Sequence, residues 1–132
     1  MAGHAIEIIL SRQLADSLNI PVFIVDPEGN LLFYNGPAEE LLGRRYEDTG
    51  EMPMKMWSSS FSQTDDDGNP LPGDELPLSI SINKHIPAHN TFWINSFDGR
   101  RIKISATAIP IVGRAGKIEG AMAMFWDTEK IA

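Results

Sequence analysis

Residues 97–127 read FDGRRIKISATAIPIVGRAGKIEGAMAMFWD, and this stretch decides the fold. One strand is marked by apolar residues that alternate with polar ones, at Ile102, Ile104, Ala106 and Ala108. Before it, Asp98-Gly99 predicts a tight type I′ turn back to a strand at 91–97, TFWINSF. After it, the glycines of 113–117 predict a second turn, and 118–127 forms the last strand. The stretch therefore predicts three consecutive antiparallel strands.

The last strand, IEGAMAMFWD, is apolar on both of its faces. One face carries Ile118, Met122, Met124 and Trp126, and the other carries Ala121, Ala123 and Phe125. A strand that is covered on both sides belongs in the middle of a sheet. We therefore expect an N-terminal helix, or the same helix of a second copy, to cover its outer side.

The N-terminal half supplies a helix, two strands and several short helices. Residues 5–18 carry an apolar stripe at helical spacing, formed by Ile6, Ile9, Leu10, Leu14 and Leu18. Residues 21–35 predict a strand, a Pro-Glu-Gly-Asn turn and a second strand. Short helices are expected at 38–42 and 76–85, with one or two helical turns at 54–61. Five antiparallel strands with grouped helices predict an α+β fold.

The composition limits the class of protein. The chain has 132 residues, the size of one domain, and 42% of them are hydrophobic. It has no apolar run near the roughly 18 residues of a membrane span, no recognisable signal peptide and no cysteine. These features favour a cytoplasmic protein without disulfides. Residues 1–75 carry a net charge of −10 and residues 76–132 a net charge of +3, which argues against binding to nucleic acid.

Three stretches, taken together, resemble the PAS domain family. They are FIVDPEGNLLFYNGPAEELLG at 23–43, DDDGNPLPGDELPLSISI at 65–82, and the stretch at 97–127. The resemblance covers about residues 5–129 and implies a five-stranded antiparallel sheet with short helices on one face and an N-terminal amphipathic helix. One departure lies at the end of the last strand, where Asp127 is followed directly by Thr128. Many family members have an aliphatic residue between these two.

The resemblance also implies an organisation and a role. Residues 1–20 would form the N-terminal helix, 21–129 the PAS core, and 130–132 the start of a linker to an output domain. The module would be a sensor in a signalling protein such as a histidine kinase or a cyclase. It would bind a small ligand, form a homodimer through Ile6, Ile9, Leu10 and Leu14, or do both; a domain with an empty pocket would only mediate protein contacts. A ligand would act by shifting the population of two arrangements of the sheet and helix.

A ligand pocket is expected where the inner face of the sheet meets the short helices. We predict that it is lined by Asn35, Met54, Trp57, Phe61, Ile80, Trp93, Ile104, Met122 and Met124. Methionine adapts to irregular spaces, which suits either a pocket for an apolar ligand or an ordinary core. Tryptophans are more often simple core residues than ligand contacts.

Two cofactors are considered as an alternative function. His85, near the end of the helix at 76–85, is a possible axial ligand for haem, although a histidine at a helix C-terminus is also favoured by the helix dipole. A flavin held without a covalent bond is compatible with Asn35, Trp57 and Trp93. The absence of cysteine excludes any chromophore linked through a thiol.

Metal binding and catalysis are weakly supported by the sequence. Asp65, Asp67 and Asn69 match three ligand positions of an EF-hand loop, but Pro70 and Leu76 occupy its glycine and glutamate positions. We therefore expect a scaffold loop and no metal site. No serine or threonine lies in a nucleophile motif, so we expect no enzyme. The rival hypothesis is a small α+β isomerase or hydrolase that uses a carboxylate in the central cavity.

Overall fold

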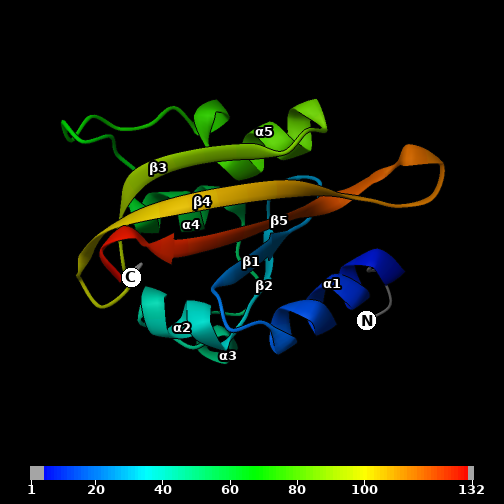
Figure 1. The fold of residues 1–132 in the computed structure, drawn as a ribbon, viewed down its shortest axis with the longest axis horizontal. Coiled ribbons are helices and arrows are strands. Elements are labelled where there is room, and N and C mark those ends of the chain that lie inside the picture. Colours follow the sequence, from blue (N-terminus) through cyan, green and yellow to red (C-terminus); the bar gives the residue numbers. More distant parts are fainter. Residues whose placement is uncertain (1–4, 131–132) are drawn as a thin grey trace.

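A computed structural model describes residues 5–130 and has the predicted α+β architecture (Figure 1). Its single sheet has the strand order β2-β1-β5-β4-β3, and all neighbouring strands are antiparallel. The strands are β1 (Val22–Val25), β2 (Leu31–Tyr34), β3 (Ala88–Asn95), β4 (Arg101–Val112) and β5 (Ile118–Asp127). The last strand in the sequence therefore lies in the middle of the sheet, as its two apolar faces predicted.

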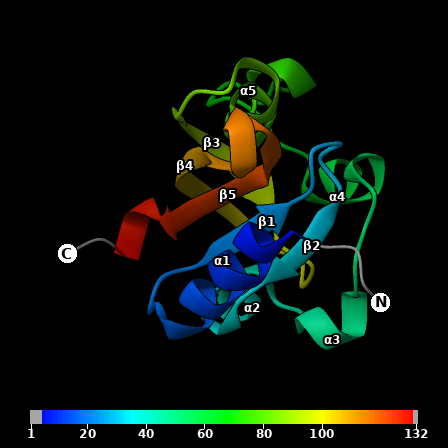
Figure 2. The same ribbon diagram turned by 90° about the vertical axis from the view of Figure 1, so that its right-hand side faces the viewer.

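Helices cover both faces of the sheet. The α-helices are α1 (Ile6–Ser17), α2 (Gly36–Leu42), α3 (Tyr46–Thr49), α4 (Met54–Phe61) and α5 (Pro77–Lys84), and short 3-10 turns are η1 (Gly73–Glu75), η2 (Arg114–Gly116) and η3 (Thr128–Lys130). On the inner face, α5 packs against β3, β4 and β5, and α4 packs against β3. On the outer face, α1 packs against β1, β4 and β5, and Figure 2 shows it lying against β1. The helix α3 was not predicted, because a four-residue helix is too short to show a helical period.

The core is divided into two clusters by the sheet. The inner cluster contains Phe23, Trp57 and Phe125, and the outer cluster contains Ile8 and Met122. Along β5 the residues alternate between the two clusters, since side chains of a strand point to opposite faces. Met122 and Met124 belong to the outer cluster, so the prediction that they line an inner pocket is wrong.

Helix α1 approaches the sheet closely at one glycine of β5. A Cβ built on Gly120 would lie 2.2 Å from the main-chain oxygen of Val25 and 3.1 Å from Cδ1 of Ile8. The φ angle of Gly120 is +151°, a value that residues with a side chain rarely adopt. Only glycine therefore allows β1, β5 and α1 to pack at this distance.

The turn between β3 and β4 differs from the predicted type I′. Among the described residues Gly99 has a positive φ of 86°, but Asp98 does not have a positive φ, and a type I′ turn needs both. The main-chain N–H of Ser96 donates to the oxygen of Arg100, which leaves a three-residue loop with glycine last. The N–H of Phe97 inside this loop donates to the oxygen of Leu42 at the end of α2.

Candidate functional site

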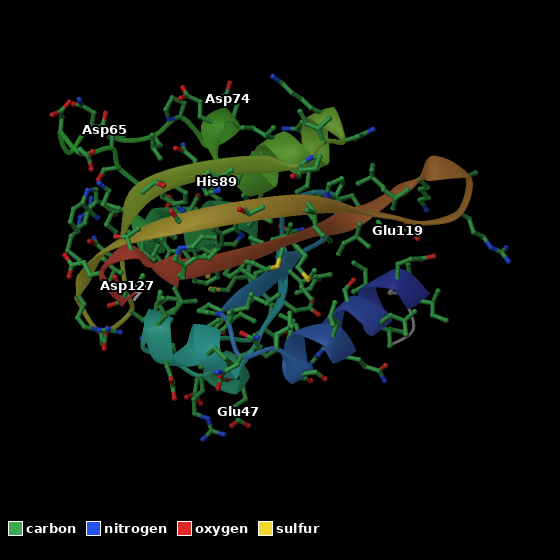
Figure 3. All side chains as sticks on the ribbon, viewed as in Figure 1. Glu47, Asp65, Asp74, His89, Glu119 and Asp127 are labelled. Atoms are coloured by element: carbon green, nitrogen blue, oxygen red, sulfur yellow. The ribbon has the colours of Figure 1, made fainter. Side chains whose placement is uncertain are left out.

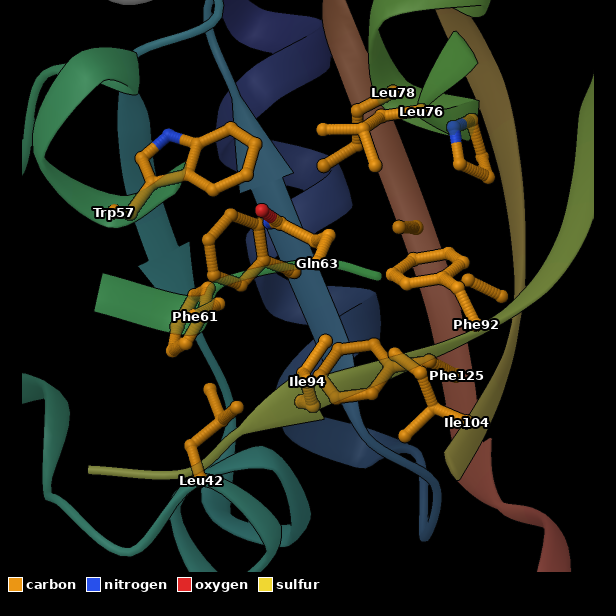
Figure 4. A pocket seen from close by; sticks show the side chains of 14 residues that line it. Leu42, Trp57, Phe61, Gln63, Leu76, Leu78, Phe92, Ile94, Ile104 and Phe125 are labelled. Atoms are coloured by element: carbon orange, nitrogen blue, oxygen red, sulfur yellow. The ribbon is translucent and has the colours of Figure 1, made fainter. Parts of the chain in front are cut away.

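A small cavity lies on the inner face of the sheet, between the strands and helices α4 and α5 (Figure 4). Its volume is about 60 Å³. The residues that line it are Phe23, Leu42, Trp57, Phe61, Gln63, Leu76, Pro77, Leu78, Phe92, Ile94, Ile104, Ala106, Ala123 and Phe125. Thirteen of these fourteen side chains are apolar, so the cavity suits an uncharged ligand.

The strands shape the floor of the cavity by alternation of side chains. Each of three strands contributes two inward-facing side chains that are two residues apart. These pairs are Phe92 and Ile94 on β3, Ile104 and Ala106 on β4, and Ala123 and Phe125 on β5. The hollow lies where two of these positions are occupied by the small alanine side chain. A larger residue at either position would fill the space.

Aromatic rings form one wall of the cavity. The ring of Phe23 lies 5.3 Å from that of Trp57 and 6.2 Å from that of Phe61, both in edge-to-face geometry. Trp57 and Phe61 are four residues apart on α4 and therefore share one face of the helix. The indole N–H of Trp57 donates to the main-chain oxygen of Gly29 at 3.0 Å, which fixes the ring in place. This wall is pre-organised.

Gln63 is the one polar side chain in the lining. Its carboxamide forms no hydrogen bond with any residue of 5–130, and Figure 4 shows it between the aromatic wall and Phe92. The lining contains no Asp, Glu or His among these residues, so the cavity offers no carboxylate for the rival enzyme hypothesis. Sequence analysis missed Gln63 because a lone glutamine after a helix follows no recognisable pattern.

Three of the nine predicted pocket residues line the cavity, namely Trp57, Phe61 and Ile104. Met54 and Ile80 are half-buried and lie outside the lining. Trp93 faces the opposite side of β3, where its ring lies 6.0 Å from the ammonium group of Lys103. Its position alternates with those of Phe92 and Ile94, so it cannot share their face.

Asn35 is buried but has a structural role outside the cavity. Its Oδ1 accepts from the N–H groups of Val22 and Ala38, and its Nδ2 donates to the oxygens of Ala15 and Ile20. These four bonds use both lone pairs and both N–H donors of the carboxamide, all with main-chain partners. The prediction that Asn35 lines the pocket is therefore wrong.

His85 lies at the surface. It is the C-cap of α5, has a left-handed backbone with φ of 60°, and is outside the cavity lining. Another histidine of the sequence, His4, lies outside the described residues. His85 cannot ligate a group held in the cavity without movement of the end of α5.

The sequence of the chain matches a protein-family model described as PAS domain over residues 10–79. This match covers more than half of the chain. The chain belongs to the PAS domain family. PAS domains are sensory modules. Comparison of this chain with curated protein sequences gave no match.

Solved PAS domains share the fold at low sequence identity. The PAS domain of a protein from Colwellia psychrerythraea is 18% identical, with a TM-score of 0.66 over 91% of this chain and 95% of that one. The PAS domain of Bordetella pertussis BvgS is 17% identical, with a TM-score of 0.61 over 92% and 84%. The LOV domain of the blue-light activated histidine kinase EL346 from Erythrobacter litoralis is 16% identical, with a TM-score of 0.65 over 83% and 96%. These likenesses show the fold alone.

Flavin and haem do not fit the cavity of this PAS domain. Pockets for drug-sized ligands have volumes of about 300–1,000 Å³, whereas this cavity has about 60 Å³. Even benzene occupies a cavity of about 150 Å³ in a protein core. The alternative function as a haem or flavin sensor is therefore not supported by the geometry.

The acidic loop of the PAS domain uses its carboxylates for internal contacts. Asp65 accepts from the main-chain N–H groups of Asp67 and Asn69, as a turn-forming aspartate does. Asp66 accepts from the indole N–H of Trp93 at 2.9 Å and pairs with Lys103 at 3.0 Å. The hydrogen bond from Lys103, and then that from Trp93, lower the pKa of Asp66. This arrangement agrees with a scaffold loop.

Proposed function

We propose that this PAS domain is the sensory module of a signalling protein and that it dimerises through α1. The parent would be a histidine kinase or a cyclase in the cytoplasm, and the cavity would bind a small apolar ligand. In this proposal residues 1–20 serve dimerisation, 21–129 form the sensor and 130–132 begin the linker to an output domain. The observation that carries the proposal is the exposed apolar face of α1.

Helix α1 is apolar on two opposite sides. Ile8 and Ala15 are buried against the sheet. On the other side the exposed fractions are 64% for Ile6, 50% for Ile9, 55% for Leu10 and 51% for Leu14. At 100° per residue these four fall on one stripe about 180° from the buried pair. An exposed apolar stripe of this kind marks an interaction surface.

A second copy of the chain is the occupant that fits this stripe. Two identical stripes can meet across a two-fold axis, which is the commonest symmetry of soluble dimers. A membrane surface fits less well, because helices that lie on membranes carry a basic polar face. The charged residues of α1 are Glu7, Arg12 and Asp16, so the helix has no such face.

The sheet connects the cavity to the dimer helix. Ala123 and Phe125 of β5 line the cavity, whereas Met122 on the same strand packs in the outer cluster with Ile8 of α1. A ligand that displaces the inner side chains therefore acts on the strand that supports α1. Differential affinity for two positions of β5 would shift the dimer between two arrangements.

Sedimentation velocity tests the dimer directly. We expect the chain to be a dimer at micromolar concentration and the variant Leu10→Glu to be a monomer, because a buried carboxylate without a partner is strongly unfavourable. Asn83→Glu, which adds the same charge at an exposed polar position of α5 on the other face of the sheet, should remain a dimer. A monomeric wild-type chain, or a dimeric Leu10→Glu variant, would remove the basis for the proposal.

A further inference from the structure

One wall of the cavity is formed by a segment that differs from the rest of the fold. Residues 63–72, called the flap from here on, connect α4 to η1 along the outer edge of β3 (Figure 1). Gln63, at the start of the flap, lines the cavity, and Leu71, near its end, packs against the inner core cluster. Figure 3 shows Asp65 in a loop that extends beyond the sheet. The flap therefore separates the cavity from solvent at this edge.

The flap is internally bonded and can move as one unit. Its two sides are joined by main-chain hydrogen bonds, from Leu71 to Gln63 at 3.0 Å and from Asp65 to Asn69 at 3.0 Å. The side chain of Asp65 closes the tip, as described above. A segment held together in this way keeps its shape when its attachment to the sheet is released.

Both ends of the flap have the properties of hinges. Ser62, just before the flap, has a left-handed backbone with φ of 46°, a conformation that costs energy for a residue other than glycine. Gly73, just after it, is a glycine whose Cβ position is open, since an added Cβ would meet nothing within 4 Å. Hinges in moving loops are a few terminal positions of this kind that absorb changes in φ and ψ.

The flap is attached to the sheet mainly through exposed polar groups. Thr64 and Trp93 exchange main-chain hydrogen bonds of 3.0 and 2.9 Å at the edge of β3. Arg101 donates to the oxygen of Ser62 and to Oγ1 of Thr64, and Asp66 binds Trp93 and Lys103. Arg101 and Asp66 are exposed to solvent. Exposed polar contacts are individually weak, so they can open at low cost, and of the flap's apolar side chains only the partly buried Leu71 leaves the inner core cluster.

From these features we propose that the flap is a gate, which swings on Ser62 and Gly73 away from β3 and admits a small apolar molecule to the cavity. This proposal depends on the proposed function in one respect, namely that the cavity is the ligand site. Opening exposes Gln63, whose free carboxamide would then meet the incoming molecule first. The dimer through α1 lies on the other face of the sheet and does not enter this inference.

The test combines amide hydrogen exchange with NMR of dissolved xenon on the full chain. Xenon enters dry cavities lined by Leu, Ile and Phe. The double variant Asp66→Asn, Arg101→Gln removes the charges from the two side-chain tethers and leaves the main-chain bonds between Thr64 and Trp93. The double variant Asp67→Asn, Arg114→Gln makes the same charge changes at exposed sites and serves as the control. In the tether variant we expect the rate of amide exchange at Thr64 and Trp93 to rise about tenfold. The rate of xenon entry should rise by a similar factor. The rate of amide exchange at Ala106 and Ala108 should not change.

Three results would overturn the gate. The first is unchanged exchange at Thr64 and Trp93 in the tether variant. The second is exchange that rises equally throughout the sheet, which indicates global destabilisation. The third is faster amide exchange at Thr64 and Trp93 while xenon enters no faster than in the wild type, or does not enter at all. Sedimentation of the same samples reports separately on the dimer, so failure of the gate and failure of the dimer can be told apart.

Discussion

The side-chain amide of Asn35 donates a hydrogen bond of 2.8 Å to the main-chain oxygen of Ala15, and thereby joins the end of β2 to the last turn of α1. The same carboxamide binds Ile20, Val22 and Ala38, so one buried residue fixes α1, the start of β1 and the start of α2. The position of the proposed dimer helix relative to the sheet therefore depends on Asn35.

Replacement of Asn35 should loosen α1 more than the rest of the fold. The variant Asn35→Asp keeps an acceptor for the N–H groups of Val22 and Ala38 but loses the donor to Ala15 and Ile20. We expect the free energy of unfolding to fall by about 2–4 kcal/mol, measured by urea denaturation. Amide exchange should rise in α1 before it rises in β4. Asn83→Asp at an exposed position of α5 is the control, and equal losses in the two variants would contradict the role of Asn35.

The close packing at Gly120 gives a second prediction. The variant Gly120→Ala places a methyl group 2.2 Å from the main-chain oxygen of Val25, and a main-chain atom cannot rotate away. We expect the variant to lose about 3 kcal/mol or more of stability, with α1 detached from the sheet.

Gly36→Ala is the matched control for this change. An added Cβ at Gly36 meets nothing within 4 Å, and its φ is not positive. Its stability should stay within about 1 kcal/mol of the wild-type value or rise. Comparable urea midpoints for the two alanine variants would show that the strands can separate at Gly120 at little cost.

The sequence predicts the strands well but not the face that each side chain takes. Alternation along β4 at Ile102 to Ala108 separates a buried face from a polar one, so the inner side is evident. Both faces of β5 are apolar, and alternation alone cannot tell which one meets the cavity. The larger Met122 and Met124 suggest a pocket, but the cavity lies beside the smaller Ala123, because a hollow forms where side chains are short.

The same ambiguity affects α1. Its large apolar residues at Ile6, Ile9, Leu10 and Leu14 form a stripe of the kind that usually packs on a sheet. The structure instead buries Ile8 and Ala15, since the small Ala15 and the glycine of β5 permit close approach. Helical spacing identifies apolar faces, but with two such faces only the shape of the partner surface decides between them.

The two inward-facing alanines of β4 should respond differently when each is replaced by the larger valine. Ala106 lines the cavity, whereas Ala108 faces the same side of β4 but lies outside the lining and is fully buried. We expect Ala106→Val to stay within about 1 kcal/mol of wild-type stability and Ala108→Val to lose about 1–3 kcal/mol. Urea denaturation measures both. The filled variant Ala106→Val should also fail to take up xenon, and uptake equal to that of the wild type would place the bound atom elsewhere.

The contact between Asp66 and the indole of Trp93 should depend on pH. Hydrogen bonds from Lys103 and Trp93 lower the pKa of Asp66 below its ordinary value of 3.8, which means that the ionised form is favoured in the folded protein. The stabilisation from this carboxylate is therefore fully present above 3.8 and is lost as the pH falls through the lower folded pKa.

NMR of the Trp93 indole N–H follows this titration at the contact itself. We expect its chemical shift to change with a midpoint below 3.8, together with faster amide exchange at Thr64. The change should vanish in Asp66→Asn and persist in Asp67→Asn, an exposed neighbour of the same charge. Far-UV circular dichroism in parallel separates this local step from acid unfolding. A Trp93 signal that titrates identically in Asp66→Asn would show that another carboxylate, and not Asp66, holds the flap against β3.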